Sequence, residues 1–421
     1  MEPKKLVLRC FLVILFTSSC ATAFSLEKES NRLSPVIFVP GDGGSQLDAK
    51  LNKSTVIHYM CDKRTDWFNA WLNMELLVPF VIDCWIDNVR LIYDNDTRTT
   101  ENPPGVQTRV PGWGDPEVVE WIDPSRASTG AYFKDIGNAL VNLGYERGHS
   151  IRGAPYDFRK EIVILRFVIL RLHENKQWFI DMKELVEETY NQNGRTAVTL
   201  ITHSMGSPMS MLFLQNQSQQ WKRKYIARVL SLAGAWAGSV KAVKVYAMGD
   251  DLGSLMLSAK TMRAEQITSP SLAWLLPSPY FWKADEVLVE SPDRTYTLAQ
   301  LRDYFDDINY MPGWEMRQDT MRYTMQFTPP DVELHCLYGT KIPTVEKLVY
   351  KKSAIAGEIP KLVTGDGDGT VNLRSLEACM HWQPFQKPSI SMFGFPGVDH
   401  MTILKNDTVI KYILDVLSNH K

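Results

Sequence analysis

Long apolar runs are scarce in this chain of 421 residues. One, residues 10–16, follows three basic residues and precedes a small-residue cleavage site, which is the pattern of a secretory signal peptide over residues 1–23. The other, residues 162–172, is too short to span a membrane and contains two arginines. We therefore expect a mature protein of residues 24–421 that is soluble in the secretory pathway or beyond it.

Neither sign of charge dominates, and cysteine is sparse. The formal net charge of −2 becomes −4 once a signal peptide with three basic residues and one acidic residue is removed, which argues against nucleic acid as a partner. Four cysteines remain outside that segment, Cys61, Cys84, Cys336 and Cys379. An even number in an oxidising compartment predicts two disulfides. Three pairings are open, and we expect the one that joins nearest neighbours.

Four N-glycosylation sequons are consistent with a secretory route, at Asn52, Asn95, Asn216 and Asn406. Short sequons also arise by chance. Asn216 falls near the end of an expected helix, so Asn52, Asn95 and Asn406 are the glycosylation sites that we predict.

No linker, repeat or low-complexity tract divides the chain, and strand-like and helix-like patterns alternate along it. Strands are expected at residues 36–39, 197–201 and 229–232, before Gly365 and at residues 390–395, and helices at residues 179–190, 209–215 and 408–417. This alternation predicts an α/β fold with a mainly parallel sheet covered on both faces. Strand-like and helix-like patterns no longer alternate at about residues 55–90 and 239–330, and we interpret these two segments as insertions into a single domain.

A serine lies between one of these strands and the helix that follows it. Thr202-His203-Ser204-Met205-Gly206 separates the apolar run 197–201 from the helical pattern 209–215. A tight strand-to-helix turn of this kind is a nucleophile elbow, which exposes the serine hydroxyl and aims helix N–H groups at the site. The layout predicts an α/β-hydrolase fold with Ser204 as the nucleophile.

A nucleophilic serine needs a base and an acid, and both candidates follow it in hydrolase order. Of eight histidines, His400 is the one on a loop after an expected strand and before an expected helix. His203, on the elbow itself, points away from the substrate side. The acid is Asp366 or Asp368, in a Gly-Asp-Gly-Asp-Gly loop that lacks the closing Glu of an EF-hand, so we expect no metal there.

The oxyanion of an acyl-transfer intermediate needs two N–H donors. One is the backbone of Met205, directly after the nucleophile. The other should come from the turn after the first strand, where Asp42 follows Gly41.

An aromatic and aliphatic stripe lies between the first two cysteines outside the predicted signal peptide, at Trp67, Phe68, Trp71, Leu72 and Leu76. The spacing of Trp67, Trp71, Leu72 and Leu76 predicts one face of a helix. Such a stripe is usually part of a core. Because this one lies in an insertion and beside a short predicted disulfide, we interpret it as a surface that binds a phospholipid membrane.

Several of these segments together resemble the lecithin:cholesterol acyltransferase family, and in particular its lysosomal phospholipase branch. They are Val36-Ile-Phe-Val-Pro-Gly-Asp-Gly-Gly-Ser-Gln-Leu47, Trp71-Leu-Asn-Met-Glu-Leu-Leu77, Asp83-Cys-Trp-Ile-Asp87, Arg152-Gly-Ala-Pro-Tyr-Asp157, His203-Ser-Met-Gly206 and Gly365-Asp-Gly-Asp-Gly-Thr-Val-Asn372. The likeness runs from about residue 33 to the end.

The resemblance implies a serine hydrolase and acyltransferase without a cofactor. Ser204 would be the nucleophile, Asp368 the acid and His400 the base, with Asp42 and Met205 in the oxyanion hole. Family members cleave a fatty acyl chain from a phospholipid and pass it to water or to a lipid alcohol such as ceramide.

The resemblance also implies the surroundings of the site. The disulfides would be Cys61–Cys84 and Cys336–Cys379. The first insertion would be a membrane-binding subdomain, and residues 248–269 of the second a mobile lid. The implied location is the lysosome, with secretion as the alternative.

Asp42 distinguishes two branches of the family, because the lysosomal branch has Asp there and the plasma sterol acyltransferases have Cys. A carboxylate repels a developing oxyanion, whereas a protonated carboxyl can donate to it. We therefore expect Asp42 to favour an acidic pH optimum. The alternatives are a sterol acyltransferase that acts on lipoproteins and a non-catalytic lipid carrier, against which the Ser204, Asp368 and His400 set argues.

The chain departs from the family pattern at three points. Thr202 stands where the elbow usually has Gly or Ala, which predicts a strained turn. Residues 233–238 replace a Gly-Ala-Pro-Trp-Gly-Gly segment and alter the predicted pocket wall. Residues 161–178 have no clear family counterpart, and a membrane-facing insertion, a buried strand and a mistranslated exon boundary all remain open.

Overall fold

The computed structural model describes residues 33–127, 130–160, 175–253, 257–324 and 327–418. The predicted signal peptide, residues 1–23, lies outside these ranges, as does most of the unassigned segment 161–178. Within the described ranges, no helix combines the length and the apolar composition needed to cross a lipid bilayer.

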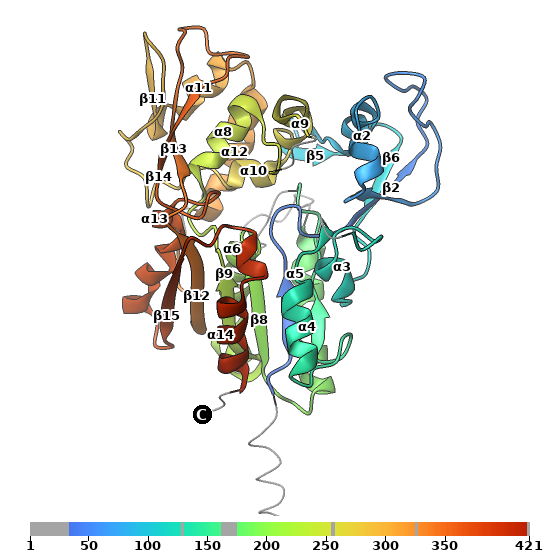
Figure 1. Ribbon diagram of the computed structural model, residues 1–421, viewed down its shortest axis with the longest axis vertical. Helices are drawn as coiled ribbons and strands as arrows, with labels where there is room; N and C mark the ends of the chain where they lie inside the picture. Colours follow the sequence, from blue (N-terminus) through green and yellow to red (C-terminus); the bar gives the residue numbers. More distant parts are fainter. Residues whose placement is uncertain (1–32, 128–129, 161–174, 254–256, 325–326, 419–421) are drawn as a thin grey trace, which may run out of the picture.

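A six-stranded sheet forms the centre of the molecule, in the order β15-β12-β9-β8-β1-β7 (Figure 1). Its strands are β1 (Val36–Val39), β7 (Ile151–Gly153), β8 (Val198–His203), β9 (Ile226–Leu232), β12 (Glu333–Thr340) and β15 (Ile390–Pro396). All neighbours pair in parallel. In β1, Phe38 lies opposite Gly153 on one side and Ile201 on the other, so the first strand of the sheet is enclosed between two later ones.

Helices cover both faces of this sheet. They include α3 (Glu117–Glu120), α4 (Lys134–Asn142), α5 (Lys176–Gln192), α6 (Gly206–Gln215), α7 (Gln219–Tyr225) and α14 (Asp407–Ser418). Val36 and Phe38 of β1 belong to the core shared with α4 and α14, while Ile37 and Val39 belong to the core shared with α5 and α6. Full burial of such side chains stabilises the fold by about 1.5–3 kcal/mol each. The predicted α/β-hydrolase fold is confirmed.

A cap lies above the carboxyl ends of the central strands in Figure 1. It contains α8 (Val240–Met248), α9 (Ala259–Gln266), α10 (Pro270–Trp274), η3 (Leu298–Gln300), α11 (Leu301–Asp307) and α12 (Met311–Thr324). A second sheet in the order β11-β10-β13-β14 completes it, with β10 (Val287–Glu290), β11 (Thr295–Thr297), β13 (Thr344–Val349) and β14 (Lys361–Gly365).

The strand that ends at Gly365 is therefore not in the parallel sheet, where the alternating pattern placed it. As β14 it pairs antiparallel with β13, with Val349 opposite Lys361. Every residue of β14 keeps some contact with solvent. Strands of a parallel sheet are normally covered on both faces, so a partly exposed strand fits the edge of the cap sheet instead.

The first insertion forms a smaller body beside the cap (Figure 1). This body extends beyond residues 55–90 on both sides. It consists of the sheet β3-β2-β6 with β2 (Leu47–Leu51), β3 (Phe68–Trp71) and β6 (Val106–Arg109), the hairpin β4 (Ile92–Asp94) and β5 (Thr99–Glu101), η1 (Met74–Leu77) and α2 (Ile82–Val89). The predicted helix through Trp67 and Leu76 is wrong. Phe68 to Trp71 form a strand against β2, because aromatic side chains favour strands and Asn69 is a weak helix former.

Two disulfides join the nearest-neighbour cysteines, which confirms the predicted pairing. Cys61–Cys84 ties the loop before β3 to α2. Cys336–Cys379 ties β12 to η4 (Ala378–Phe385). Two further short elements are α13 (Leu373–Leu376), before η4, and η5 (Thr402–Leu404), before α14.

The predicted glycosylation sites differ in exposure. Asn52 and Asn95 are exposed, as is Asn216. Asn406 is half-buried, and its Oδ1 accepts the N–H groups of Thr408 and Val409 at the start of α14.

One buried arginine joins the three parts of the molecule. The Arg159 guanidinium, 1 % exposed, donates to the Val89 carbonyl of α2 at 2.7 Å, to Thr108 Oγ1 in β6 at 3.2 Å and to Asp157 Oδ2 at 2.7 Å. Its own carbonyl accepts from Ser271 of α10. Burial acts to raise the pKa of Asp157, but the charge and hydrogen bonds of Arg159 outweigh it and lower that pKa.

We expect Arg159→Met to destabilise the protein by about 3–5 kcal/mol, because Asp157 would stay buried without its cation. The matched control is Lys352→Met, which removes an exposed pair with Glu358 and should change stability by about 0–1 kcal/mol. Denaturant unfolding of both variants checks the prediction. Equal unfolding midpoints would show that Arg159 does not hold the parts together.

Candidate active site

The nucleophile elbow forms as the sequence predicts. β8 is buried along its length and ends at His203. Ser204 follows directly, and its φ of +53° lies in the left-handed region. α6 begins two residues later at Gly206. A Cβ on Gly206 would lie 2.3 Å from the Pro40 carbonyl oxygen and 2.5 Å from that of Val39, so only glycine lets the helix approach β1 this closely.

Thr202 is accommodated in the elbow by a chain of buried hydroxyl groups. Its Oγ1 lies 2.8 Å from Ser207 Oγ, which lies 2.8 Å from Ser231 Oγ on the neighbouring strand β9. All three side chains are buried. The threonine hydroxyl that replaces the usual small residue thus has a hydrogen-bond partner, as a buried polar group requires.

Ser204, His400 and Asp368 lie within hydrogen-bonding distance of one another. His400 Nε2 is 2.9 Å from Ser204 Oγ, and His400 Nδ1 is 2.7 Å from Asp368 Oδ2. The His400 N–H also donates to the Asp368 carbonyl at 2.9 Å. Asp368 is fully buried, and its Oδ1 accepts the N–H groups of Thr370 and Val371. The arrangement matches the roles of nucleophile, base and orienting acid.

The structure separates the two candidate acids. Asp366 is exposed, and its Oδ1 accepts the Lys341 N–H instead of facing His400. Among the described residues, the group of side chains that could together bind a metal is His58, Cys61 and Cys84, away from this loop. The two sulfurs of that group are already joined in a disulfide.

A tight turn after β1 faces the elbow. The Gly44 N–H donates to the Gly41 carbonyl at 3.1 Å, and Gly43 has a φ of +69°, as the third position of a type II turn requires. A Cβ on Gly41 would lie 2.7 Å from Ser204 Cβ, so the turn touches the nucleophile. Asp42 directly follows Gly41 and is the second residue of this turn. Met205 caps α6, so its N–H is one of the donors that the helix leaves free.

Two acids in this region favour their neutral forms. Although Asp42 keeps access to solvent, the surrounding protein displaces water, and this desolvation raises the pKa of Asp42 to about 6, against the Gly43 N–H and the Lys241 cation. Burial in α9 raises the pKa of Glu265 to about 8, against the Arg159 cation. Glu265 therefore keeps its proton at neutral pH, whereas Asp42 is mostly protonated only below about pH 6.

The predicted membrane-binding residues divide into two groups. Trp71 and Leu72 are buried, and Trp71 Nε1 donates to the Gly43 carbonyl at 2.8 Å, so their assignment to an exposed surface is wrong. They pack in the core of the first insertion because β3 turns them inward. Trp67, Phe68 and Leu76 are half-buried.

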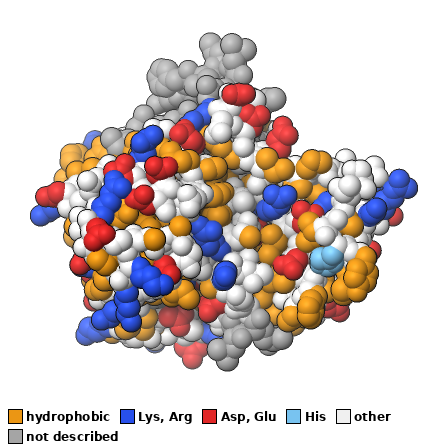
Figure 2. Space-filling model, turned by 90° about the horizontal axis from the view of Figure 1, so that it is seen from above, with side chains coloured by type: hydrophobic (Ala, Val, Ile, Leu, Met, Phe, Trp, Pro, Cys, Tyr) orange, Lys and Arg blue, Asp and Glu red, His pale blue; other side chains and the backbone are white. Residues whose placement is uncertain are grey.

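Other apolar side chains of the first insertion are exposed instead. Four of them, here called the tip patch, lie in the irregular segments just before Cys61 and just before α2, the two places that the Cys61–Cys84 disulfide joins: Ile57, Tyr59, Met60 and Phe80. Figure 2 looks down on the cap and the first insertion and shows hydrophobic side chains gathered at the right-hand end, beside a histidine. Sequence periodicity missed this patch, because irregular loops carry no period.

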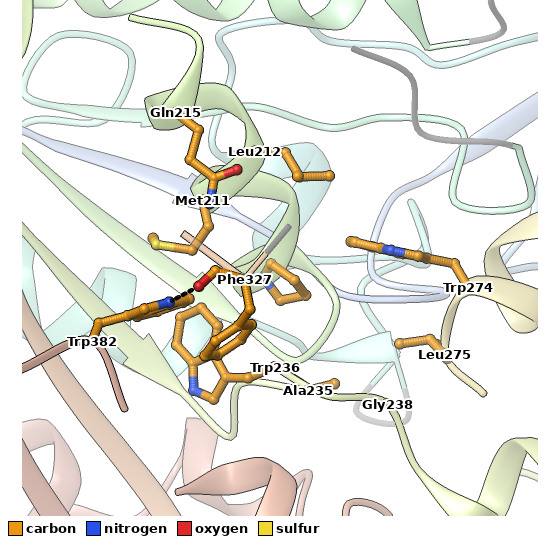
Figure 3. A pocket seen from close by; sticks show the side chains of 11 residues that line it. Met211, Leu212, Gln215, Ala235, Trp236, Gly238, Trp274, Leu275, Phe327 and Trp382 are labelled. Carbon is orange, nitrogen blue, oxygen red and sulfur yellow. Dashed lines mark hydrogen bonds between the residues drawn. The ribbon is translucent and has the colours of Figure 1, made fainter. Parts of the chain in front are cut away.

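An apolar pocket lies beside α6 (Figure 3). Met211 and Leu212 line it from the helix, Trp236, Phe327 and Trp382 from one side and Trp274 and Leu275 from the other. Its wall includes part of segment 233–238, which departs from the family pattern. Ala235 in that segment donates its N–H to the Ser204 carbonyl at 3.3 Å, so the pocket adjoins the nucleophile.

Comparison with known proteins agrees with this geometry. Residues 67–407 match the family model of lecithin:cholesterol acyltransferase. A Bos taurus protein named lysosomal phospholipase A and acyltransferase is 44% identical over 91% of each chain. The Gallus gallus phosphatidylcholine-sterol acyltransferase is 37% identical over 89% of this chain and 88% of its own.

Among solved structures, the Tle4-Tli4 complex contains a chain that aligns with a TM-score of 0.50 at 11% identity, over 92% of this chain and 99% of that one, which is a likeness of fold alone. The sequence matches, by contrast, extend through the elbow, the acid and the base. The chain belongs to the lecithin:cholesterol acyltransferase family.

Proposed function

We propose that this protein is a serine phospholipase A and acyltransferase that transfers a fatty acyl group from a glycerophospholipid to water or to a lipid alcohol such as ceramide. The continuous hydrogen bonding from Ser204 Oγ through His400 to Asp368 carries the proposal. The names of the relatives support the choice of a phospholipid as the acyl donor.

In the first half of the reaction, Ser204 Oγ attacks the ester carbonyl and its proton passes to His400 Nε2. Asp368 stabilises the resulting imidazolium through Nδ1. The tetrahedral oxyanion accepts from the backbone N–H groups of Met205 and Asp42. When it collapses, the bond to the glycerol oxygen breaks, and His400 returns the proton to the lysophospholipid that leaves.

In the second half, water or a ceramide hydroxyl attacks the acyl-serine. His400 takes the proton of the attacking oxygen and returns it to Ser204 Oγ as the ester breaks. The apolar pocket beside α6 has the chemistry to hold part of the acyl chain while the acceptor arrives.

Membrane contact belongs to the same proposal. The tip patch would insert into the headgroup region of a phospholipid surface, with half-buried Trp67, Phe68 and Leu76 behind it. In this scheme residues 55–90 dock the enzyme, and the cap of residues 239–330 encloses the lipid chains. The proposed lid is residues 248–269, of which 254–256 lie outside the described residues.

We place the enzyme in the lysosome. The protonated forms of Asp42 and Glu265 that acidic pH favours, and the names of the relatives, support this choice. A secreted sterol acyltransferase is the second candidate, favoured by the likeness to the sterol enzymes. Asp42 weighs against this second candidate. The sterol acyltransferases have Cys at this position, whereas the lysosomal branch has Asp, and the position lies in the turn that touches the nucleophile.

Phosphatidylcholine liposomes that contain short-chain ceramide test the activity. At about pH 4.5 we expect free fatty acid and acylceramide, and Ser204→Ala should lower their formation by about 10⁵–10⁶-fold. Mass spectrometry of the lipids measures both products. Product formed equally by Ser204→Ala would contradict the role of Ser204 as nucleophile. No product from the wild type at about pH 4.5 or 7.5 would contradict the proposal and favour a lipid carrier.

Asp42→Asn tests the origin of the pH dependence. In the wild type, activity should fall as pH rises through about 6, because ionised Asp42 repels the oxyanion. The amide carries no charge at any pH, so the variant should keep its activity between about pH 6 and 7.5. Rates measured across that interval decide the matter, and an unchanged profile would remove Asp42 from the explanation.

Phe80→Asp tests membrane docking. Phe80 is 75 % exposed in the tip patch, and the charge should weaken liposome sedimentation by about 10-fold or more while leaving hydrolysis of a water-soluble ester unchanged. Phe385→Asp is the matched control, since Phe385 is 74 % exposed but lies on η4. Equal losses in both variants would refute the tip patch as the docking surface.

A further inference from the structure

A buried polar chain behind the elbow is not used by the mechanism above. Tyr132 Oη accepts the Gly41 N–H at 3.0 Å and lies 2.5 Å from His203 Nδ1. His203 Nε2 lies 2.8 Å from the His400 carbonyl oxygen. Tyr132 and His203 are both buried. These hydrogen bonds therefore connect the turn of residues 41–44, here called the oxyanion turn, through Tyr132 and His203 to the backbone of His400.

Each proton in this chain can be assigned. The His400 carbonyl only accepts, so His203 Nε2 must carry the proton and donate. Burial, together with the nearby His400, lowers the pKa of His203 to about 3, so the ring is neutral and Nδ1 is an acceptor. The Tyr132 hydroxyl must then donate to Nδ1, which leaves its lone pairs for the Gly41 N–H.

Tyr132 is itself held firmly in place. Its N–H donates to the Glu120 carbonyl at 2.8 Å, and the adjacent Phe133 stacks on Phe38 of β1 with ring centroids 4.6 Å apart. A Cβ on Gly44 would lie 2.7 Å from Tyr132 Cζ, and one on Gly41 would lie 3.1 Å from its hydroxyl. The turn thus fits against the ring only because both positions are glycine.

We propose that Tyr132 and His203 are positioning residues, which fix the oxyanion turn and the His400 backbone relative to each other through one buried hydrogen-bonded chain. The inference rests on the proposed function of Ser204 as nucleophile. Neither residue touches the substrate. They act by keeping the Asp42 N–H and His400 Nε2 aimed at the same reacting centre, where small displacements cost much rate.

Tyr132→Phe tests the proposal, because it removes one oxygen and keeps the ring. We expect kcat to fall by about 10- to 100-fold with little change in KM. Tyr145→Phe is the matched control. Tyr145 is also buried in the core shared with α4, and its hydroxyl donates to the Ser34 carbonyl at 2.8 Å, away from the site. Tyr145→Phe should lower Tm about as much as Tyr132→Phe does, but it should leave kcat unchanged.

A second pair of variants tests the donor to His400. His203→Gln can keep an N–H near the Nε2 position, whereas His203→Leu cannot, so the glutamine variant should recover most of the kcat that the leucine variant loses. Labelling of Ser204 by a fluorophosphonate should slow in the same order. A Gln variant no better than Leu at equal Tm, or a Tyr132→Phe variant that matches Tyr145→Phe in kcat, would overturn the positioning role.

The proposed function can fail separately from this inference. Wild-type protein that neither reacts with the fluorophosphonate nor hydrolyses phospholipid would refute the nucleophile and the positioning role together. Normal wild-type turnover with no specific effect of Tyr132 or His203 would overturn the positioning role alone.

Discussion

The close approach of two backbone segments decides where the other parts of the site can lie. Gly206 lies against the carbonyls at the end of β1, and Gly41 lies against Ser204, each at a distance that excludes a side chain. This contact between the turn and the elbow brings the backbone after Gly41 close to the backbone after Ser204, as the proposed oxyanion hole requires. The left-handed φ of Ser204 is held by this packing. The loop after β15 then places His400 Nε2 2.9 Å from Ser204 Oγ.

Local sequence chemistry predicted several of the residues that the structure brings together at the candidate site. An elbow is contiguous, so Ser204 and Met205 were visible in five residues, and chain order with strand-to-helix context pointed to His400. The choice of Asp368 over Asp366 needed the family resemblance, since two aspartates in one loop differ only in which way they face. Tyr132 could not be predicted, because 71 residues separate it from His203 and no pattern joins them.

Helical spacing misplaced the apolar residues of the first insertion for a related reason. Trp71 occupies a strand and supports the oxyanion turn through Gly43, a contact set by β2 pairing and not by residues near it in sequence. β14 was misassigned because an edge strand of the cap and a strand of the central sheet look alike in a short window. Burial and pairing partners distinguish them, and both depend on the complete fold.

The acidic groups near the site connect stability with chemistry. Glu265 binds its proton more tightly in the folded protein than in the unfolded chain, so its contribution is fully present at acidic pH and is lost as pH rises through about 8. Asp42 changes charge at lower pH. As pH rises, Asp42 therefore ionises before Glu265, which lies in α9 of the cap.

The order of the triad along the chain has a consequence for biosynthesis. The nucleophile and the base are 196 residues apart, and the base follows β15, an edge strand of the central sheet. At roughly 5–20 residues per second, the ribosome adds His400 about 10–40 s after Ser204. During that time β8, α6 and β9 can already pack together around the elbow. In the proposed mechanism, a nascent chain shorter than 400 residues therefore has the elbow but lacks the base that deprotonates Ser204.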